Sequence, residues 1–289
     1  MRQAAAWFLI AAALLAPAHL RAEEPLEGCL AFADSLCAAG DYHRAISEYK
    51  RALFLETTPS GRSLIQLHMA ACHGRAGDYG EAAGLLRPLA EQKTPEAEPA
   101  LFDLALVYFL AGEYEEAAAT FRRFHDRYPH NPKAREALLS AGHSKIAAGH
   151  YGEAAALLRP LAARMPCAEK LLEAAGAPAP PACSPLAAGL FSAAVPGAGQ
   201  LYCGKPRQAL SSLLICGLTA WGAWASWANG YSGAGTLASF AAATVYVGGI
   251  GSAVSRARQR NEAARQGWLA ALAAGCNLRL GPGALTFVY

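Results

Sequence analysis

A glycine-rich stretch in the second half of the chain has residue types that can hold phosphate. Gly199-Gln200-Leu201-Tyr202-Cys203-Gly204-Lys205-Pro206 differs only at its last position from the G-x-x-x-x-G-K-[S/T] pattern, in which backbone N–H groups and a lysine bind nucleotide phosphates. Pro206 has no hydroxyl for Mg²⁺, no β-branched strand precedes the stretch, and a long apolar run follows it. We therefore do not interpret it as a nucleotide site.

The eight cysteines are a second group of residues with reactive side chains. Cys37 and Cys72 occupy nearly equivalent points in two neighbouring copies of a sequence unit that recurs every 35 to 37 residues. Cys167 and Cys183 flank a proline-rich segment. The spacing allows disulfides between Cys37 and Cys72 and between Cys167 and Cys183, since exported proteins meet an oxidising environment, but it does not determine which of them form.

Catalytic and metal-binding patterns do not occur in the sequence. It has no CxxC, HExxH or GxSxG, and its eight histidines are dispersed. We expect no enzyme activity, no cofactor, no metal site and no nucleic-acid partner.

Charge divides the chain into two modules. Residues 23–183 contain 16 Lys and Arg against 21 Asp and Glu, whereas residues 184–289 contain 7 against 1. The composition is 54% apolar and only 16% charged, which favours a chain with a membrane segment over a purely soluble one. We expect two modules that face two different solvents.

The N-terminal 22 residues have the layout of a secretory signal. Arg2 precedes an apolar run from Ala4 to Ala16, Pro17 ends that run, and Ala22 precedes an acidic start. We expect cleavage after Ala22. The alternative lipoprotein interpretation of Cys29 fails, because Glu27 stands where a small residue is required and Cys29 lies too far from the apolar run.

Residues 23–174 contain four copies of one sequence unit. GDYGEAAGLLRPLA from Gly77 returns as GHYGEAAALLRPLA from Gly149, with weaker copies from Gly40 and Gly112, and these glycines are 37, 35 and 37 residues apart. In each copy a glycine ends one helix and a tyrosine and an alanine open the next, so the unit is helix, tight turn, helix. We expect the following residues to form the turns and the packing between helices: Gly40, Tyr42, Ala45, Gly77, Tyr79, Ala82, Gly112, Tyr114, Ala117, Gly149, Tyr151 and Ala154.

The third copy resembles the tetratricopeptide repeat family. The residues that carry the resemblance are Leu101, Leu104, Ala105, Tyr108, Gly112, Tyr114, Ala117, Phe121 and Pro129. The resemblance covers about half of the chain, and it implies an all-α, curved helical solenoid that binds a protein or peptide partner on its groove. It does not identify that partner.

A proline- and alanine-rich linker, residues 175–184, leads to a long uncharged segment. No Asp, Glu, Lys or Arg occurs from Gln208 to Ser255, and the segment divides at Asn229–Gly233 into two stretches near residues 209–228 and 235–254. Each has about the 20 residues that cross a bilayer core, so we expect a transmembrane helical hairpin.

Residues 185–265 resemble the bacterial PGxGQxYxG membrane module, which is similar to two-transmembrane-helix domains that have a glycine-rich loop before the first helix. The motif residues are Pro196, Gly197, Gly199, Gln200, Tyr202 and Gly204. The resemblance implies a membrane location and does not assign an activity.

Basic residues on both sides of the hairpin favour cytoplasmic ends, whereas the signal sequence favours exported repeats. A third crossing by residues 185–202 reconciles the two and is the arrangement we expect; a periplasmic C-terminus is the alternative. In the tail, residues 266–289, an alternating pattern around Gly281-Pro282-Gly283 predicts a small β-hairpin.

The function that the sequence favours is a bacterial inner-membrane scaffold or adaptor with periplasmic repeats. The alternative is a component of an envelope export or assembly machine, in which the membrane module itself forms homo-oligomers or lines a path.

Overall fold

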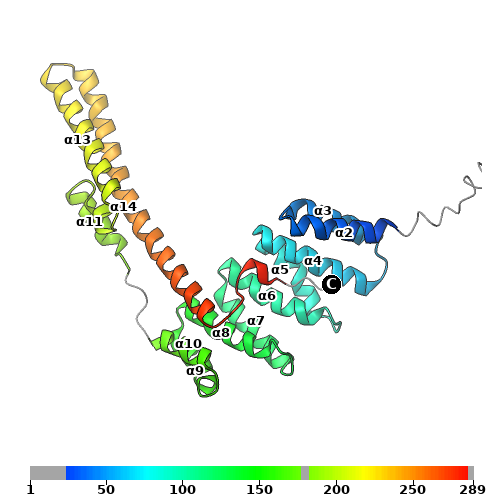
Figure 1. Cartoon of the computed structure of the whole chain (residues 1–289). Helices are drawn as coiled ribbons and strands as arrows, with labels where there is room; N and C mark the ends of the chain where they lie inside the picture. Colours follow the sequence, from blue (N-terminus) through cyan, green and yellow to red (C-terminus); the bar gives the residue numbers. More distant parts are fainter. Residues whose placement is uncertain (1–23, 177–181, 286–289) are drawn as a thin grey trace, which may run out of the picture. The chain divides into compact units, whose positions relative to one another are not determined.

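The computed structural model describes residues 24–176 and 182–285, and every regular element in those residues is helical (Figure 1). The predicted signal, residues 1–22, lies outside the described residues, as do residues 177–181 of the expected linker. Two compact units can be distinguished: residues 24–176 together with 272–285, and residues 182–271. The C-terminal tail therefore belongs to the same unit as the repeats.

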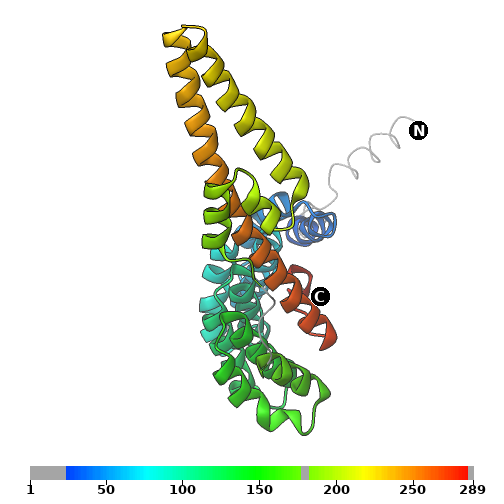
Figure 2. The same ribbon diagram turned by 90° about the vertical axis from the view of Figure 1, so that its left-hand side faces the viewer.

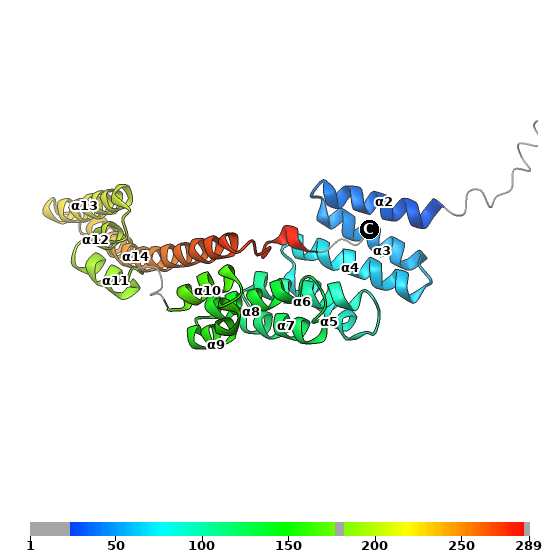
Figure 3. The same ribbon diagram turned by 60° about the horizontal axis from the view of Figure 1, so that its bottom comes forward.

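The first unit is a stack of antiparallel helix pairs (Figure 3). Its helices are α2 (Glu24–Ala38), α3 (Tyr42–Leu55), α4 (Pro59–Ala76), α5 (Tyr79–Glu91), α6 (Ala97–Ala111), α7 (Tyr114–Arg127), α8 (Ala134–Ala148), α9 (Tyr151–Ala162) and α10 (Pro166–Gly176). Each helix packs against the next one in the chain, so the contacts are mainly local, as in other repeat architectures.

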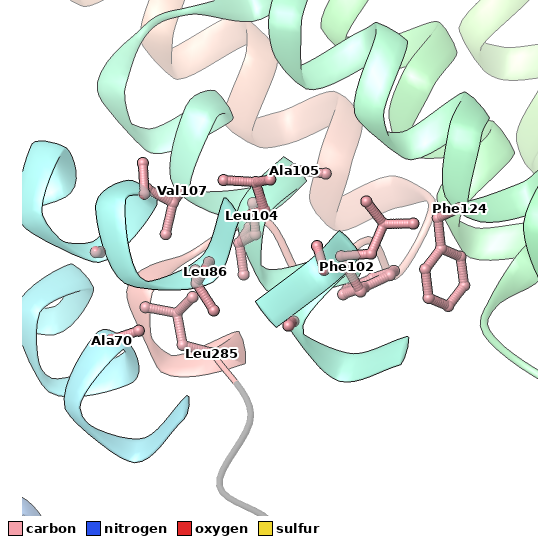
Figure 4. Packing of buried hydrophobic residues seen from close by; sticks show 14 of the residues in the cluster. Ala70, Leu86, Phe102, Leu104, Ala105, Val107, Phe124 and Leu285 are labelled. Carbon is pink, nitrogen blue, oxygen red and sulfur yellow. The ribbon is translucent and has the colours of Figure 1, made fainter. Parts of the chain in front are cut away.

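The centre of this unit is built around α6. Phe102 is 4% exposed, and its ring makes edge-on contacts with Phe121 at 5.5 Å and Phe124 at 5.2 Å between ring centroids. Figure 4 shows Phe102 and Phe124 together with Leu86, Leu104 and other members of the same apolar cluster. Burial of such aromatic rings contributes about 3–5 kcal/mol each when measured by truncation to alanine.

The second unit contains a long helical hairpin. Its helices are α11 (Pro185–Ala194), α12 (Ala198–Tyr202), α13 (Pro206–Ala228) and α14 (Ser232–Gly275), and the last turns of α14 pass into the first unit. Figure 2 shows α13 and α14 side by side, joined by a short turn. By length and apolar composition both helices can cross a membrane, and only 11% and 6% of their most apolar windows are buried.

The expected third crossing is not supported. The segment of residues 185–202 forms a 10-residue helix, a break at Val195–Gly197 and a 5-residue helix. At 1.5 Å per residue, α11 is about 15 Å long, which is half of a bilayer core of about 30 Å. The two short helices instead pack on the hairpin, where Ala188 and Cys203 are buried with Ala253 and Ala257 of α14.

The expected C-terminal β-hairpin is also wrong for the described residues. Residues 276–280 form no strand, and Pro282–Ala284 forms a single 3₁₀ turn. Leu285 lies in the apolar cluster of the repeats, close to Ala70 and Val107 (Figure 4). Packing against the helices therefore takes the place of strand pairing.

Candidate interaction surfaces

The four repeat turns have the same backbone geometry. Gly40, Gly77, Gly112 and Gly149 adopt φ values of 82°, 91°, 83° and 85°, a left-handed conformation that L-residues with a Cβ rarely adopt. The tyrosine that follows each glycine by two positions opens the second helix of its pair and is half-buried. Further along these helices, four alanines are fully buried: Ala45, Ala82, Ala117 and Ala154.

A cavity of about 1120 Å³ lies on the repeat unit between α7, α8 and α9. Exposed small residues, Ala119 of α7 and Ala156 of α9, line it together with Leu138, Leu157 and Pro160. Its lining also includes both positive and negative side chains. We call this cavity the α7–α9 groove; its size is appropriate for part of a peptide.

Ion pairs hold one side of the α7–α9 groove in shape. Lys145 of α8 binds both Glu115 of α7 and Glu153 of α9, the latter at 2.8 Å. His150 lies 2.7 Å from Glu115 through Nδ1. Hydrogen bonds from Lys145 to the two glutamates raise the pKa of this lysine, which therefore remains charged at neutral pH. This side of the groove is thus cross-linked between two repeats.

Two arginines of α7, Arg123 and Arg127, have a structural role in the repeat stack. Arg127 donates hydrogen bonds to the carbonyl oxygens of Ala90 at 2.7 Å and Gln92 at 3.0 Å, and Arg123 pairs with Glu91 at 2.7 Å. These bonds satisfy the end of α5, where helical carbonyls have no partner of their own. These two arginines therefore join neighbouring repeats and do not form a free anion site.

The C-terminal tail covers part of the surface formed by the first helices of the repeats. Leu285 is 2% exposed, and its carbonyl oxygen accepts a hydrogen bond from Arg75 at 3.3 Å. A Cβ built on Gly74 would lie 2.5 Å from the Leu285 side chain, so this glycine makes room for the leucine. Further along, the backbone N–H of Arg279 approaches Glu136 of α8 at 3.5 Å. The tail thus behaves as an internal ligand of the stack.

A polar cluster lies inside the first two repeats. Tyr49 is fully buried; it donates a hydrogen bond to Asp34 and makes an edge-on contact with His68 at 5.8 Å. Burial, followed by the neighbouring carboxylate, raises the pKa of Tyr49 well above its usual value. Because the phenol stays protonated, we assign Tyr49 a structural role and not that of a proton acceptor.

Six of the eight cysteines contact each other in pairs. Cys37 and Cys72 share the core of the first two repeats, where the hydrogen bond between them lowers the pKa of Cys37 and raises that of Cys72. This is one of the two pairs expected from the sequence, and both cysteines are free thiols in the structure.

In the other expected pair, Cys167 and Cys183 each lie beside a different cysteine. Cys276 Sγ lies 3.3 Å from the carbonyl oxygen of Cys167, and Cys167 Sγ lies 3.8 Å from that of Cys276. Burial raises the pKa of Cys276 to about 11. Cys183 packs beside Cys203, whose pKa burial also raises. Pairing of Cys167 with Cys183 thus competes with two other contacts, one of which joins residues more than 100 positions apart.

The glycines of the PGAGQLYCG stretch permit close packing of backbone segments. Gly197 and Gly204 adopt φ values of 92° and 73°. A Cβ on Gly197 would overlap the carbonyl of Ala209, and one on Gly199 would overlap the carbonyl of Ala188. Pro196 precedes this left-handed turn, at the break between α11 and α12. Glycine is required here for packing.

The polar residues of the same stretch join the short helices to α14. Gln200 is 1% exposed; it donates hydrogen bonds to Gly249 O at 3.2 Å and Ser252 Oγ at 3.1 Å. The side-chain oxygen of Gln200, Oε1, accepts a hydrogen bond from Ser192 Oγ at 3.1 Å. Ser192 Oγ in turn accepts one from the backbone N–H of Gly199. Buried polar groups that are satisfied in this way fix one arrangement of the helices.

Tyr202 of α12 adds contacts to α11 and to the residue before it. Its hydroxyl accepts a hydrogen bond from the N–H of Ser184 at 3.3 Å, and its ring lies edge-on to Phe191. The amide of Asn261 in α14 binds the N–H and the C=O of Cys183, both at 2.8 Å.

The backbone of the stretch cannot cradle a phosphate. The N–H groups of Leu201, Cys203, Gly204, Lys205 and Gln208 already donate to carbonyl oxygens within the stretch. A nucleotide loop needs those N–H groups free and directed at the ligand. The interpretation against a nucleotide site therefore agrees with the hydrogen bonding.

Three features of these surfaces were missed in the sequence. They are the docking of Leu285 on the repeats, the contacts of Cys276 and Cys203, and the role of Asn261. The docking of Leu285 and the contact of Cys276 with Cys167 join residues more than 100 positions apart, and Cys203 contacts Cys183 across short helices. None of these contacts has a local sequence signal. Asn261 stands in the basic run after the second predicted span, where a polar residue draws no attention.

Comparison with known families supports the repeat assignment. The model of the tetratricopeptide repeat family matches residues 73–132, a segment that contains α5, α6 and α7. No curated protein is significantly similar to the chain. The described helices on both sides of the match continue the same helix–turn–helix unit, so the first unit is a tetratricopeptide-type repeat stack. The match does not extend to residues 185–265, whose resemblance to PGxGQxYxG modules stays a prediction.

Proposed function

We propose that this protein is a membrane-anchored scaffold of the bacterial cell envelope, in which the repeat stack binds a protein partner and the α13–α14 hairpin holds it at the inner membrane. The observation that carries the proposal is the contrast between the two units. One has a well-packed core and an open groove, and the other exposes its large apolar side chains. Anchoring raises the effective concentration of a partner at the membrane surface.

The partner-binding part of the scaffold is the α7–α9 groove. Tetratricopeptide-type repeats are used to bind proteins, and the tail already occupies part of the surface of the first helices. The lining of the groove combines small apolar residues with charges of both signs, which favours a peptide with both apolar and charged side chains.

The repeats and the tail lie on one side of the membrane. Two crossings return the chain to the side from which it entered, and residues 272–285 pack in the repeat unit. The signal sequence predicts that this side is the periplasm, whereas Lys205, Arg207, Arg256 and Arg258 predict the cytoplasm. We propose the periplasm, because the first targeting segment usually dominates topology.

Two reporter fusions test the orientation, one placed after Gly176 and one after Tyr289. A reporter that is active only in the periplasm is expected to be active at both sites. Activity at neither site would place the whole assembly in the cytoplasm. Activity at one site alone would restore the third crossing.

Site-specific photo-crosslinking in cells tests the groove. A photoreactive residue at Ala119 or Ala156 is expected to capture one defined envelope protein, and the same residue at the exposed position Lys50 of α3 is the matched control. Equal capture from Lys50, or no capture from either groove position, would reject the groove as the binding surface.

A second candidate function is a machine component whose membrane helices self-associate. A cavity of about 430 Å³ on the hairpin is lined by Gly217, Ala220, Ala242 and Ala243, small residues of the kind that permit close helix packing. Replacement of residues 185–265 by an unrelated anchor discriminates between the two functions. A scaffold keeps its crosslinked partner, and a machine component loses both its activity and its self-association.

A further inference from the structure

A second cavity lies in the hairpin unit, at the level where charged residues give way to the uncharged segment. Its volume is about 820 Å³, and its lining includes Lys205, Arg256 and Arg260 but no Asp or Glu. The uncharged segment starts and ends within three residues of Lys205 and Arg256. In the membrane proposed above, this level is that of the lipid headgroups.

Helix geometry directs the cations of the cavity to one place. Arg256 and Arg260 are four residues apart in α14 and therefore share one face of the helix. Lys205 comes from the residue just before α13, so that the cavity lies at the N-terminus of a 23-residue helix. The positive end of that helix adds to the attraction of an anion.

Neighbouring residues hold the two arginines in position. Arg256 donates a hydrogen bond to Gln208 of α13. The guanidinium of Arg260 lies against Gly204, at 3.4 Å from the position that a Cβ would occupy. Gly204 is left-handed and lacks a side chain, so Arg260 can reach the entrance of α13. The carboxylate of Glu262, nearby in α14, is directed to Arg265 at 3.9 Å.

We infer that the cavity formed by Lys205, Arg256 and Arg260 binds the phosphate of an anionic phospholipid. Guanidinium groups form paired hydrogen bonds with phosphate oxygens, and lysine adds a point charge. A lipid is favoured over a free phosphate because the cavity adjoins the uncharged segments of both helices, which would cover the acyl chains. The inference rests on the proposed membrane location.

The test uses the full-length protein in nanodiscs of phosphatidylcholine, with or without phosphatidylglycerol, followed by transfer into detergent and native mass spectrometry. The wild-type protein is expected to retain phosphatidylglycerol. Arg256→Gln and Arg260→Gln are expected to reduce retention at least fivefold each, because each loses the paired hydrogen bonds of a guanidinium to the lipid phosphate. Arg260→Lys is expected to retain part of the lipid.

Arg258→Gln is the matched control, because this exposed arginine of α14 is not part of the lining. It removes the same charge at the same level of the membrane and is expected to change retention less than twofold. An equal loss in the control and the cavity variants, or equal retention of both lipids by the wild type, would overturn the inference. Helical circular dichroism of each variant verifies that it is folded.

Two further measurements separate the alternatives. Addition of inorganic phosphate tests the other source of the same chemistry. The site is one for free phosphate if millimolar phosphate binds to the lipid-free protein, prevents lipid retention, and the protein shows no preference between phosphatidylglycerol and phosphatidylcholine. Failure of the protein to enter neutral nanodiscs would instead reject the membrane location, independently of the cavity.

Discussion

The helices α6 and α13 are both predominantly apolar, yet their side chains end in opposite environments. In α6, Leu101, Leu104 and Val107 are no more than 4% exposed, because helices α5 and α7 cover them. In α13, Leu218 and Trp224 are 64% and 68% exposed in the described structure. An apolar helix therefore needs another apolar surface to cover its side chains. For α6 this surface is protein, and for α13 we propose that it is lipid.

Charge introduced at the middle of the hairpin is expected to have the largest effect. Leu218→Lys together with Val247→Lys places a cation in each proposed span, at about 2.5–3.5 kcal/mol per residue in a bilayer centre. We expect the protein to appear in the carbonate-extractable fraction. Phe54→Lys is the control, since Phe54 is 88% exposed on α3 of the repeat unit. Retention of the double variant in membranes would reject the hairpin as an anchor.

Loss of a core ring is expected to be next in size. Phe121 is fully buried against Phe102, and Phe121→Ala leaves a cavity that costs about 3–5 kcal/mol. Urea unfolding followed by circular dichroism measures the change. Phe54→Ala should shift the midpoint little, because the ring is already exposed. Equal shifts in both variants would contradict the assigned core.

The docked tail should contribute a smaller amount. Leu285→Ala removes a buried side chain beside Gly74 and is expected to cost about 2–3 kcal/mol of tail docking. Limited proteolysis should then cleave the tail near Arg279 faster than in the wild type. Leu186→Ala, which truncates a 73% exposed side chain of α11, serves as the control. Unchanged cleavage would mean that the tail is held by other contacts.

The smallest of the four effects concerns the glycine-rich stretch. Gly199→Ala places a methyl group against the carbonyl of Ala188 and is expected to destabilise the hairpin unit by about 1–3 kcal/mol. Gly217→Ala adds the same methyl group where nothing lies within 4 Å and should be nearly neutral. Thermal unfolding in detergent compares the two. A larger loss for Gly217→Ala would reject close packing as the reason for the motif.

Patterns that are local in sequence predicted local structure well. The spacing of Gly40, Gly77, Gly112 and Gly149 predicted the helix pairs, because each left-handed turn depends on a single residue. The stretch from Gln208 to Ser255 predicted two long apolar helices by its lack of charge. The β-hairpin was wrong for the described residues 276–285 and the third crossing was not supported, because short segments such as these and residues 185–202 adopt the conformation that their tertiary neighbours allow.

The sequence by itself determined the repeat period, the all-α class and the presence of two long apolar helices, since these follow from the residue types in consecutive positions. Only the tertiary structure decided the position of Leu285 against Gly74, the partners of Cys167 and Cys183, and the convergence of Lys205 with Arg256 and Arg260. These contacts join residues separated by about 20 to more than 200 positions. Their formation depends on how helices pack, and no local pattern encodes it.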